Sequence, residues 1–340
     1  MKDIRKHARK LMQGTCRVCP ACDGRACAGE VPGMGGLGSG HSFMANYNAL
    51  AAVRLNMRLI HEAVEPDTSV RLLGLTLSLP VLAAPIGGVS YNMAGAIPEA
   101  DYIRSVIDGC KQAGTIGCTG DGVPEPIHQE AFAAIRDAGG HGIPFIKPWE
   151  DEELYRKLEG AVDTGAKVLG MDIDAAGLVT LRKQGRPVSP KTPEKLREII
   201  EWCPVPFVLK GVMTPDEAKI ARDVGAAGIV VSNHGGRVLD HTPGTAEVLP
   251  QISAAVRGEL TVFVDGGVRT GEDVLKMLAL GADAVLIGRP FSVAAVGGLA
   301  EGVGKYLEQL RLDFTRSLVL TGCRDVAAVG PHILFNGGGR

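Results

Sequence analysis

The sequence has few aromatic side chains, almost no net charge and no long uninterrupted apolar run. Aromatic residues make up only 4% of its 340 residues, and 36 lysines and arginines against 38 aspartates and glutamates leave a net charge of −2. A protein that binds nucleic acid usually carries a basic excess, so this balance argues against such a partner. No run reaches the roughly 18–20 apolar residues of a membrane-spanning helix. The basic start, MKDIRKHARK, is not followed by the apolar core of a secretory signal, so we expect a cytoplasmic protein.

Glycine and cysteine are plentiful. The chain has 46 glycines, which is roughly twice the usual share, and they follow no fixed period, so a collagen-like repeat is excluded. Hydrophobic residues make up 45% of the chain, too many for a disordered polymer. Half of the eight cysteines fall between Cys16 and Cys27. The others stand singly in apolar segments and are expected to be reduced core residues: Cys110, Cys118, Cys203 and Cys323.

From residue 79 onward, short apolar runs alternate with longer amphipathic segments. The runs are continuously apolar, which is typical of parallel strands buried on both faces. Strands are expected at residues 80–86, 115–119, 144–147, 167–173, 206–212, 228–232, 261–265 and 284–288. Helices are expected at residues 98–112, 126–137, 192–201, 215–224 and 271–280, with one more at 42–54 and closing helices within 303–328. Eight such units over about 230 residues predict an α/β fold, a (β/α)8 TIM barrel with an N-terminal cysteine- and glycine-rich extension.

Polar residues and glycines follow the expected strands at their carboxyl ends, which form the active-site rim of such a barrel. The segment Asp265–Arg269 and the pair Gly288-Arg289 follow the last two strands, where backbone N–H groups and arginines commonly hold a phosphate. The alternative is that these glycines only close tight loops. His234, three residues before Arg237, joins a proton acceptor to a carboxylate clamp. This pair suits proton removal from a 2-hydroxy acid.

Several motifs together resemble one enzyme family. Ser232–Asp240, Asp265–Arg269 and Gly288-Arg289 are similar to the signatures of the FMN-dependent α-hydroxy-acid oxidase/dehydrogenase family, typified by glycolate oxidase, lactate oxidase and flavocytochrome b2. The similarity extends from about Asn46 to Leu334. It includes Leu72-Leu73-Gly74, Ala83-Ala84-Pro85, Val208-Leu209-Lys210-Gly211 and Leu320-Thr321-Gly322-Cys323, in the family's order. The resemblance implies oxidation of a 2-hydroxy acid to a 2-oxo acid, with FMN as hydride acceptor, in a homo-oligomer that is a tetramer.

The resemblance also implies roles for individual residues. His234 is the base, Arg237 binds the substrate carboxylate, and Asp174, rather than Asp172, supports the histidine. A capping role in the following loop is the alternative for Asp174. Lys210 lies beside the flavin, where a cation stabilises the anionic reduced ring. The residues expected to bind FMN are Pro85, Ile86, Gly87, Thr119, Lys147, Lys210, Ser232, Asp265, Gly267, Arg269, Gly288 and Arg289.

The chain departs from the family at the substrate-binding tyrosines. The loop at residues 30–36 has no tyrosine, and Trp149 stands where a second family tyrosine is expected. Arg182 is the candidate for a second substrate-binding arginine. Tyr91 and Asn92 either line the substrate pocket or pack the loop. The departures indicate retained dehydrogenation chemistry with a substrate other than simple glycolate or lactate.

Four cysteines have no counterpart in the family pattern. Cys16, Cys19, Cys22 and Cys27 follow the spacing C-x2-C-x2-C-x4-C. Four thiolates without histidine suit a [4Fe–4S] cluster or a structural zinc ion, and disulfides or free thiols stay open. A cluster beside a flavin offers a one-electron exit, so we expect a dehydrogenase that uses an electron-carrier protein rather than O2. Residues 1–40 are expected to form this segment and residues 41–340 the FMN-binding barrel.

Two other functions stay open. One is that of an FMN-dependent type 2 isopentenyl-diphosphate isomerase, which shares the barrel and flavin site but needs diphosphate ligands in place of the His234 and Arg237 pair. The other is a flavin and iron–sulfur electron-transfer protein without catalysis. Bleaching of the flavin by 2-hydroxy acids separates the enzyme from both alternatives.

Overall fold

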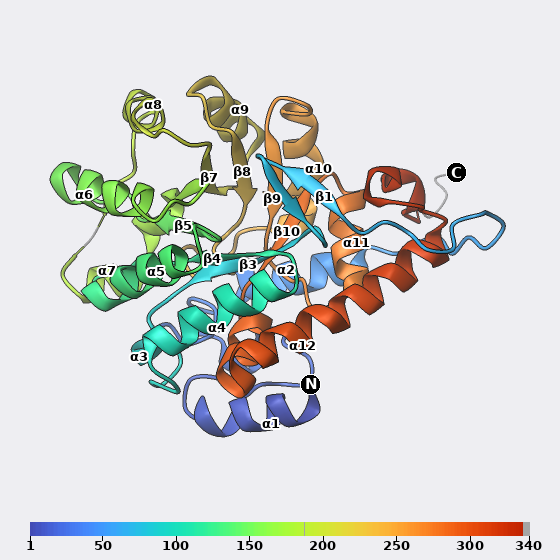
Figure 1. Ribbon diagram of the computed structural model, residues 1–340, viewed down its shortest axis with the longest axis horizontal. Coiled ribbons are helices and arrows are strands. Elements are labelled where there is room, and N and C mark those ends of the chain that lie inside the picture. Colours follow the sequence, from blue (N-terminus) through green and yellow to red (C-terminus); the bar gives the residue numbers. More distant parts are fainter. Residues whose placement is uncertain (187, 336–340) are drawn as a thin grey trace.

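A closed barrel of eight parallel strands forms the centre of the computed structural model, which describes residues 1–186 and 188–335 (Figure 1). The strand β10 pairs with both β9 and β3 and so closes the barrel. The strands are β3 (Val81–Ile86), β4 (Ile116–Thr119), β5 (Ile143–Ile146), β6 (Leu169–Asp172), β7 (Phe207–Val212), β8 (Gly228–Val231), β9 (Thr261–Val264) and β10 (Ala284–Ile287). The barrel and all eight expected strands are confirmed, with ends shifted by one or two residues.

A helix follows each barrel strand and covers its outer face (Figure 1). These helices are α4 (Glu99–Gln112), α5 (Glu125–Asp137), α6 (Asp151–Val162), α8 (Pro193–Trp202), α9 (Pro215–Asp223), α10 (Thr245–Ala255), α11 (Gly271–Ala279) and α12 (Arg289–Thr321). Threonine side chains accept backbone N–H groups at the starts of α8, α9 and α11, which is the usual way a helix begins. Neither α6 nor α10 was expected; α10 contains Pro250, a residue that argues against a helix interior.

The last helix begins earlier than expected. It starts at Arg289, directly after β10, and is interrupted by non-helical backbone at Gly298 and Leu299. Two helical segments therefore stand where closing helices were expected only from residue 303. Two short 3-10 helices, η3 (Val326–Ala328) and η4 (Pro331–Ile333), follow α12.

The barrel interior is a packed core, closed at one end by a small hairpin. Side chains such as Val208, Val230 and Phe263 fill the interior. The hairpin of β1 (Val70–Leu72) and β2 (Leu75–Leu77) packs its leucines and valine against this core. Its turn uses left-handed backbone at Leu73 and Gly74, as tight hairpins require. The hairpin thus covers this end of the barrel core.

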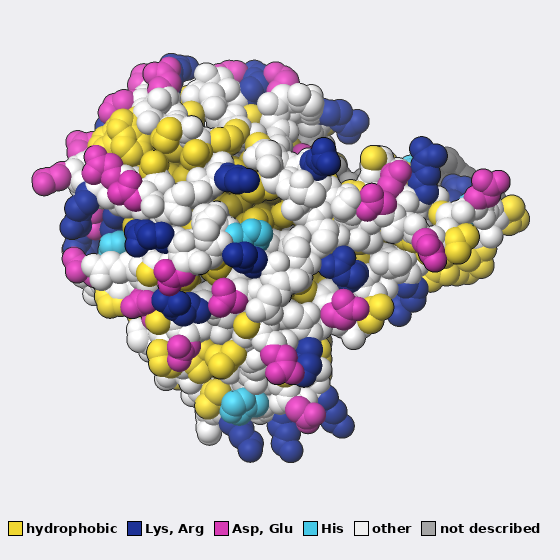
Figure 2. All heavy atoms as spheres, viewed as in Figure 1, with side chains coloured by type: hydrophobic (Ala, Val, Ile, Leu, Met, Phe, Trp, Pro, Cys, Tyr) yellow, Lys and Arg dark blue, Asp and Glu magenta, His cyan; other side chains and the backbone are white. Residues whose placement is uncertain are grey.

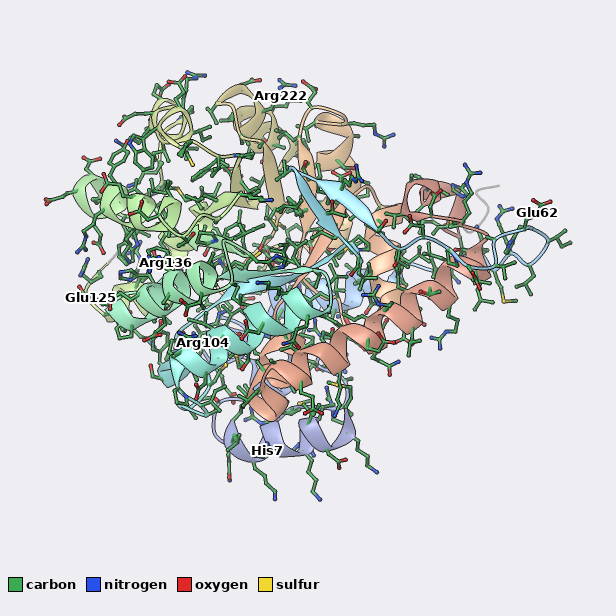
Figure 3. The ribbon with its side chains drawn as sticks, viewed as in Figure 1. His7, Glu62, Arg104, Glu125, Arg136 and Arg222 are labelled. Carbon is green, nitrogen blue, oxygen red and sulfur yellow. The ribbon has the colours of Figure 1, made fainter. Side chains whose placement is uncertain are left out.

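The N-terminal residues lie against the barrel's outer helices. Helix α1 (Lys2–Leu11) was not expected from the sequence, and it packs on α12 with Ala8 fully buried (Figure 1). Ile4 contacts Gly297 and Gly298, where a larger residue would collide with it. Basic side chains of α1 project from the lower edge of the molecule in Figure 2, and Figure 3 labels His7 on the same helix. Helix α2 (His41–Ala52) follows near its expected place.

Charges of both signs are interspersed over the face shown in Figure 2. The loop between α2 and β1, which carries Glu62 at its tip in Figure 3, exposes Met57, Leu59, Ile60 and Val64. Exposed apolar groups of this kind often mark a contact with another chain, and the expected homo-oligomer stays a prediction. Within residues 1–186 and 188–335, no helix combines the length and apolar character needed to cross a membrane.

Candidate active site

His234 lies on the rim just beyond β8, in strained backbone. Its φ is +56°, and Gly235 and Gly236 follow with φ of +64° and +77°. Left-handed backbone is uncommon for a residue other than glycine, and such strain clusters at functional sites. A Cβ on Gly236 would lie 2.5 Å from the Phe43 nitrogen, and one on Gly235 would lie 2.8 Å from Arg289 Nη1. The two glycines therefore let the histidine loop approach α2 and Arg289 closely.

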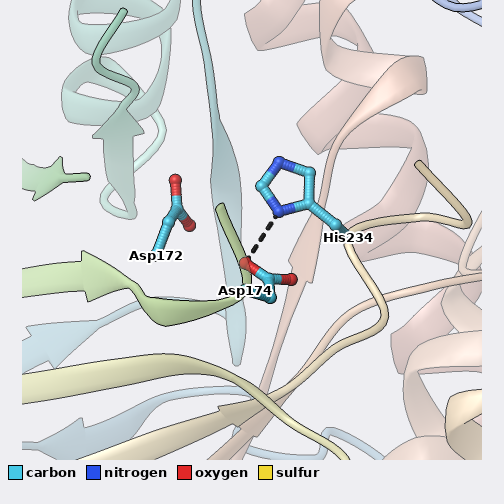
Figure 4. Close-up of side chains that lie close together, drawn as sticks. All are labelled: Asp172, Asp174 and His234. Carbon is cyan, nitrogen blue, oxygen red and sulfur yellow. Dashed lines mark hydrogen bonds and ion pairs between the residues drawn. The ribbon is translucent and has the colours of Figure 1, made fainter. Parts of the chain in front are cut away.

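Asp174 orients the imidazole of His234. Asp174 belongs to η2 (Ile173–Gly177), directly after β6, and its Oδ1 lies 2.9 Å from His234 Nδ1 (Figure 4). The two side chains are only 10% and 15% exposed. When Nδ1–H donates to this carboxylate, Nε2 keeps its lone pair and can accept a proton. The structure thus brings together the expected base and its expected supporting carboxylate.

Asp172, the last residue of β6, contacts two lysines instead. Its Oδ1 lies 3.1 Å from Lys210 Nζ, and its Oδ2 lies 3.7 Å from Lys147 Nζ. Burial opposes both charges, but the carboxylates around Lys210 raise its pKa, and the two lysines lower the pKa of Asp172. Asp172, Asp174 and His234 lie close enough to share a cation. The Lys210 ammonium, 3.3 Å from His234 Nδ1, already supplies positive charge there.

Arg237 is fixed within the same cavity by neutral partners. Its guanidinium donates to the Gly33 carbonyl at 2.5 Å and to Asn92 Oδ1 at 2.9 Å. Burial lowers the pKa of Arg237 to about 10, so it stays charged near neutral pH. Both of these partners are uncharged, which leaves the charge of Arg237 available for an anionic ligand.

A tyrosine reaches this cavity from another part of the chain. Tyr91 and Asn92 belong to α3 (Val89–Asn92), and both line the cavity with His234 and Arg237. Burial and the Glu99 carboxylate raise the pKa of Tyr91 to about 12, so its phenol keeps the proton. Tyr91 and Asn92 could either line the substrate pocket or pack the loop, and the structure favours the first role. Tyr91 supplies a phenol although the loop at residues 30–36 has none.

Most residues expected to bind FMN line this one cavity. They are Pro85, Ile86, Gly87, Lys147, Lys210, Asp265, Gly267, Arg269, Gly288 and Arg289. Ser232 lies behind it, where its hydroxyl donates to Asp265 at 2.8 Å and accepts the His234 N–H at 3.0 Å. Thr119 is buried at the end of β4 and does not line this cavity.

The donors and acceptors present fit a polar, phosphate-bearing group. Thr119 Oγ1, Asp265 Oδ1 and Arg269 Nε are buried without hydrogen-bond partners among the described residues. Buried polar atoms are normally paired, so Asp265 Oδ1 and Arg269 Nε, whose residues line the cavity, are available to a ligand there, whereas Thr119 lies outside it. Arg269 and Arg289 place positive charge at the ends of β9 and β10, the usual phosphate site of this fold. FMN has a phosphate and a polar ring edge, and the site suits both.

Two expected substrate-binding residues do not reach the cavity. Trp149 is buried, and its indole Nε1 donates to Asp121 at 2.5 Å. Arg182 is exposed on α7 (Val179–Lys183). Leu178 and Leu181 from the same segment line the cavity instead. Nothing in the sequence distinguished these leucines, because a leucine beside a pocket has the same pattern as one in the core.

Asp121 lines the same cavity and forms a buried ion pair that sequence reasoning missed. Its Oδ1 lies 2.7 Å from Lys157 Nζ, and both side chains are at most 2% exposed. We expect Lys157→Ala to lower the free energy of unfolding by roughly 3–5 kcal/mol, because it leaves a buried carboxylate without its counter-ion. Denaturant unfolding measures this, with the exposed Lys305→Ala as control, which should change stability by less than about 0.5 kcal/mol. Equal stability of the two variants would contradict the account.

The four N-terminal cysteines line a second cavity. Cys16, Cys19, Cys22 and Cys27 are free thiols around a space of about 590 Å³. The second cavity adjoins the first, because both are lined by Met34, Gly267, Arg269 and Arg289.

Comparison with known proteins agrees with this geometry. The model of the family described as FMN-dependent dehydrogenase matches residues 33–193 and 180–336. The chain is 33% identical to 4-hydroxymandelate oxidase of Amycolatopsis orientalis over 341 residues, covering 89% of this chain and 94% of that protein. It is 30% identical to L-lactate dehydrogenase of Pseudomonas paraeruginosa, covering 88% of this chain and 92% of the relative.

Solved structures give the same picture. The crystal structure of mandelate oxidase with benzoyl-formic acid superposes with a TM-score of 0.79 at 30% identity, covering 98% of this chain and 97% of that one. The crystal structure titled mandelate oxidase alone gives a TM-score of 0.79 at 29% identity over the same shares.

Proposed function

The chain belongs to the FMN-dependent dehydrogenase family, and from this premise we propose that it oxidises a 2-hydroxy acid to a 2-oxo acid with FMN bound at the barrel rim. The observation that carries the proposal is one cavity lined by His234, by the charged Arg237 and by most of the expected FMN-binding residues, with Asp174 bonded to the His234 imidazole. The test mixes a 2-hydroxy acid with one equivalent of FMN-loaded protein under anaerobic conditions. Chromatography then measures whether the 2-oxo acid forms.

The residues divide the chemistry between them. Arg237 and Tyr91 bind the substrate carboxylate, the guanidinium through a charged fork and the phenol through its O–H. His234 Nε2 takes the proton of the α-hydroxyl, and Asp174 stabilises the imidazolium that results. FMN supplies the acceptor for the hydride that leaves the α-carbon. Lys210, held charged by Asp172, places positive charge at the cavity wall, where it stabilises developing negative charge. The O–H bond thus loses its proton to His234, and the C–H bond loses its hydrogen with both electrons as the hydride.

Asp174→Asn tests the support of the histidine. The amide keeps the shape of the carboxylate but cannot balance the imidazolium charge, and a charged hydrogen bond contributes roughly 1.5–3 kcal/mol. We therefore expect kcat to fall about 10- to 150-fold while the KM of the hydroxy acid changes little. Steady-state kinetics measure both. Asp172→Asn is the matched control, because Asp172 pairs with lysines and not with His234. If both variants changed kcat and KM equally, Asp172 and Asp174 would not have separate roles.

The substrate's side chain meets an apolar wall. Met34, Leu178 and Leu181 line the cavity, and a buried methylene contributes about 0.8 kcal/mol, or roughly fourfold in affinity. We expect kcat/KM to rise from glycolate through lactate to larger apolar 2-hydroxy acids. Leu181→Ser should reduce that slope, with the exposed Leu312→Ser as control. A flat or inverted series in the unchanged protein would contradict an apolar substrate.

The comparisons support FMN as cofactor and do not support the two alternative functions, the isomerase and the non-catalytic electron-transfer protein. A metal centre at the N-terminal cysteines and transfer of electrons to a carrier protein go beyond these relatives. Both are our proposals from the ligand chemistry of this chain.

A further inference from the structure

The cysteine segment and the barrel rim enclose a single chamber. Cys16, Cys19, Cys22 and Cys27 lie on the segment between α1 and α2, and all four line the same cavity of about 590 Å³. Its opposite wall comes from Tyr47 and Leu50 of α2 and from the rim and α12. The remaining cysteines lie elsewhere, at positions outside this cavity. Four cysteines from twelve consecutive residues thus line one space large enough for a multi-atom group.

Basic side chains hold the cysteine loop in this conformation. Arg5 donates to the Cys19 carbonyl at 2.6 Å, and Arg9 donates to the Val18 carbonyl at 2.8 Å. From the barrel side, Arg269 donates to the Cys22 carbonyl at 2.9 Å. The Val18 N–H donates to Cys16 Sγ at 3.4 Å, and Val18 itself has left-handed backbone, with φ of +45°. The arginines therefore fix the loop through its backbone carbonyls, and none of the four cysteines is in a disulfide.

The charge around the chamber suits an anionic occupant. Five cationic side chains line it: Arg5, Arg17, Arg269, Lys276 and Arg289. Among the residues that the structure describes, two carboxylates do so, Asp23 and Asp273. A metal group held by four thiolates carries net negative charge, and this excess of positive charge stabilises it.

The two candidate metal groups differ in the sulfur arrangement and the volume that they require. Four thiolates around one zinc ion, at about 2.3 Å from the metal, lie roughly 3.8 Å from one another. In the described chain, no three of these sulfurs lie within 4.8 Å of one another. A [4Fe–4S] cluster binds one thiolate at each of four iron corners, so it spreads the sulfurs further apart and fills more volume. The large cavity favours the cluster, which fills more volume than a single zinc ion.

We infer that Cys16, Cys19, Cys22 and Cys27 bind a [4Fe–4S] cluster in this chamber, next to the phosphate end of the flavin site. Arg269 and Arg289 line both cavities and so form their shared wall. The role of the cluster rests on the proposed function, because that reaction supplies the electrons. Oxidation of one 2-hydroxy acid to the 2-oxo acid releases two electrons and two protons. A one-electron centre here passes those electrons singly to two equivalents of an external one-electron carrier protein.

The experiment measures iron, acid-labile sulfide, zinc and FMN in anaerobically purified full-length protein. We expect about four iron and four sulfide per chain in the unchanged protein and in Cys203→Ala, a control at a half-buried cysteine outside the chamber. Cys19→Ala and Cys27→Ala should lose most of the iron and sulfide and keep FMN. Stoichiometric zinc without sulfide, or no metal after anaerobic reconstitution with iron and sulfide, would overturn the inference.

A second measurement separates this inference from the proposed function. Cys19→Ala should still show flavin bleaching by the hydroxy acid at an unchanged rate, while reduction of cytochrome c, a one-electron carrier, should fall at least tenfold. Unchanged cytochrome c reduction would overturn the role as electron exit. Loss of bleaching in every variant, including Cys203→Ala and the unchanged protein, would refute the proposed function and leave the metal content as an independent result.

Discussion

The variant His234→Asn should reduce its flavin roughly 10²- to 10⁴-fold more slowly than the unchanged protein. General base catalysis contributes an acceleration of that order, and asparagine cannot accept the hydroxyl proton at neutral pH. The substitution keeps a short polar side chain, which tolerates the left-handed backbone at this position, φ +56°. Anaerobic stopped-flow absorbance of the bound flavin measures the rate directly.

A histidine on the same loop provides the control for this variant. His241 also has left-handed backbone, with φ of +61°, but its side chain is 73% exposed. His241→Asn should bleach at the rate of the unchanged protein. FMN content checks that both variants keep the cofactor. A His234→Asn rate within threefold of the control would remove His234 as the base.

Replacement of Arg237 should have the second large effect. Arg237→Met removes the cavity's charged fork, and loss of one partner of a buried charge pair costs roughly 2–5 kcal/mol. We expect kcat/KM for a 2-hydroxy acid to fall about 30- to 5000-fold, chiefly through KM. Arg237→Lys keeps the charge but loses the two-pronged geometry, so it should recover only part of the loss.

The matched control separates loss of recognition from loss of structure. Arg182→Met changes an exposed arginine on α7 that does not line the cavity, and it should leave kcat/KM unchanged. The amide of the same hydroxy acid lacks the carboxylate, so Arg237→Met should turn over acid and amide with similar efficiency. Retained preference of Arg237→Met for the acid would show that another group binds the carboxylate. Loss of activity in Arg182→Met would restore the role expected for it from the sequence.

The barrel was predictable because its signals are local. Each strand is a continuously apolar run that ends in glycine or a polar group, and β8 followed by His234 is one such unit. The hairpin of β1 and β2 was not predictable, because each strand has only three residues and gains stability by plugging the barrel. Helix α1 is largely charged, and its small apolar face becomes significant only against α12.

The site was predictable where a motif fixes both residue type and position. His234, Arg237 and Asp265 are of this kind, and the cavity holds all three. Trp149 was expected at the substrate, but the partner of its indole is Asp121, 28 positions away in the chain. Such long-range pairing depends on how β4 and β5 lie side by side, and no local pattern reveals it. The separate contacts of Asp172 and Asp174, only two residues apart, likewise depend on the turn into η2.

Anaerobic mixing of the FMN-loaded protein with a panel of 2-hydroxy acids tests the central claim most directly. The reactive pair of His234 and Asp174 beside Arg237 predicts that at least one apolar 2-hydroxy acid bleaches the flavin completely. One 2-oxo acid should form for each flavin reduced, because a hydride carries both electrons. A fully FMN-loaded protein that no member of the panel bleaches would contradict the account.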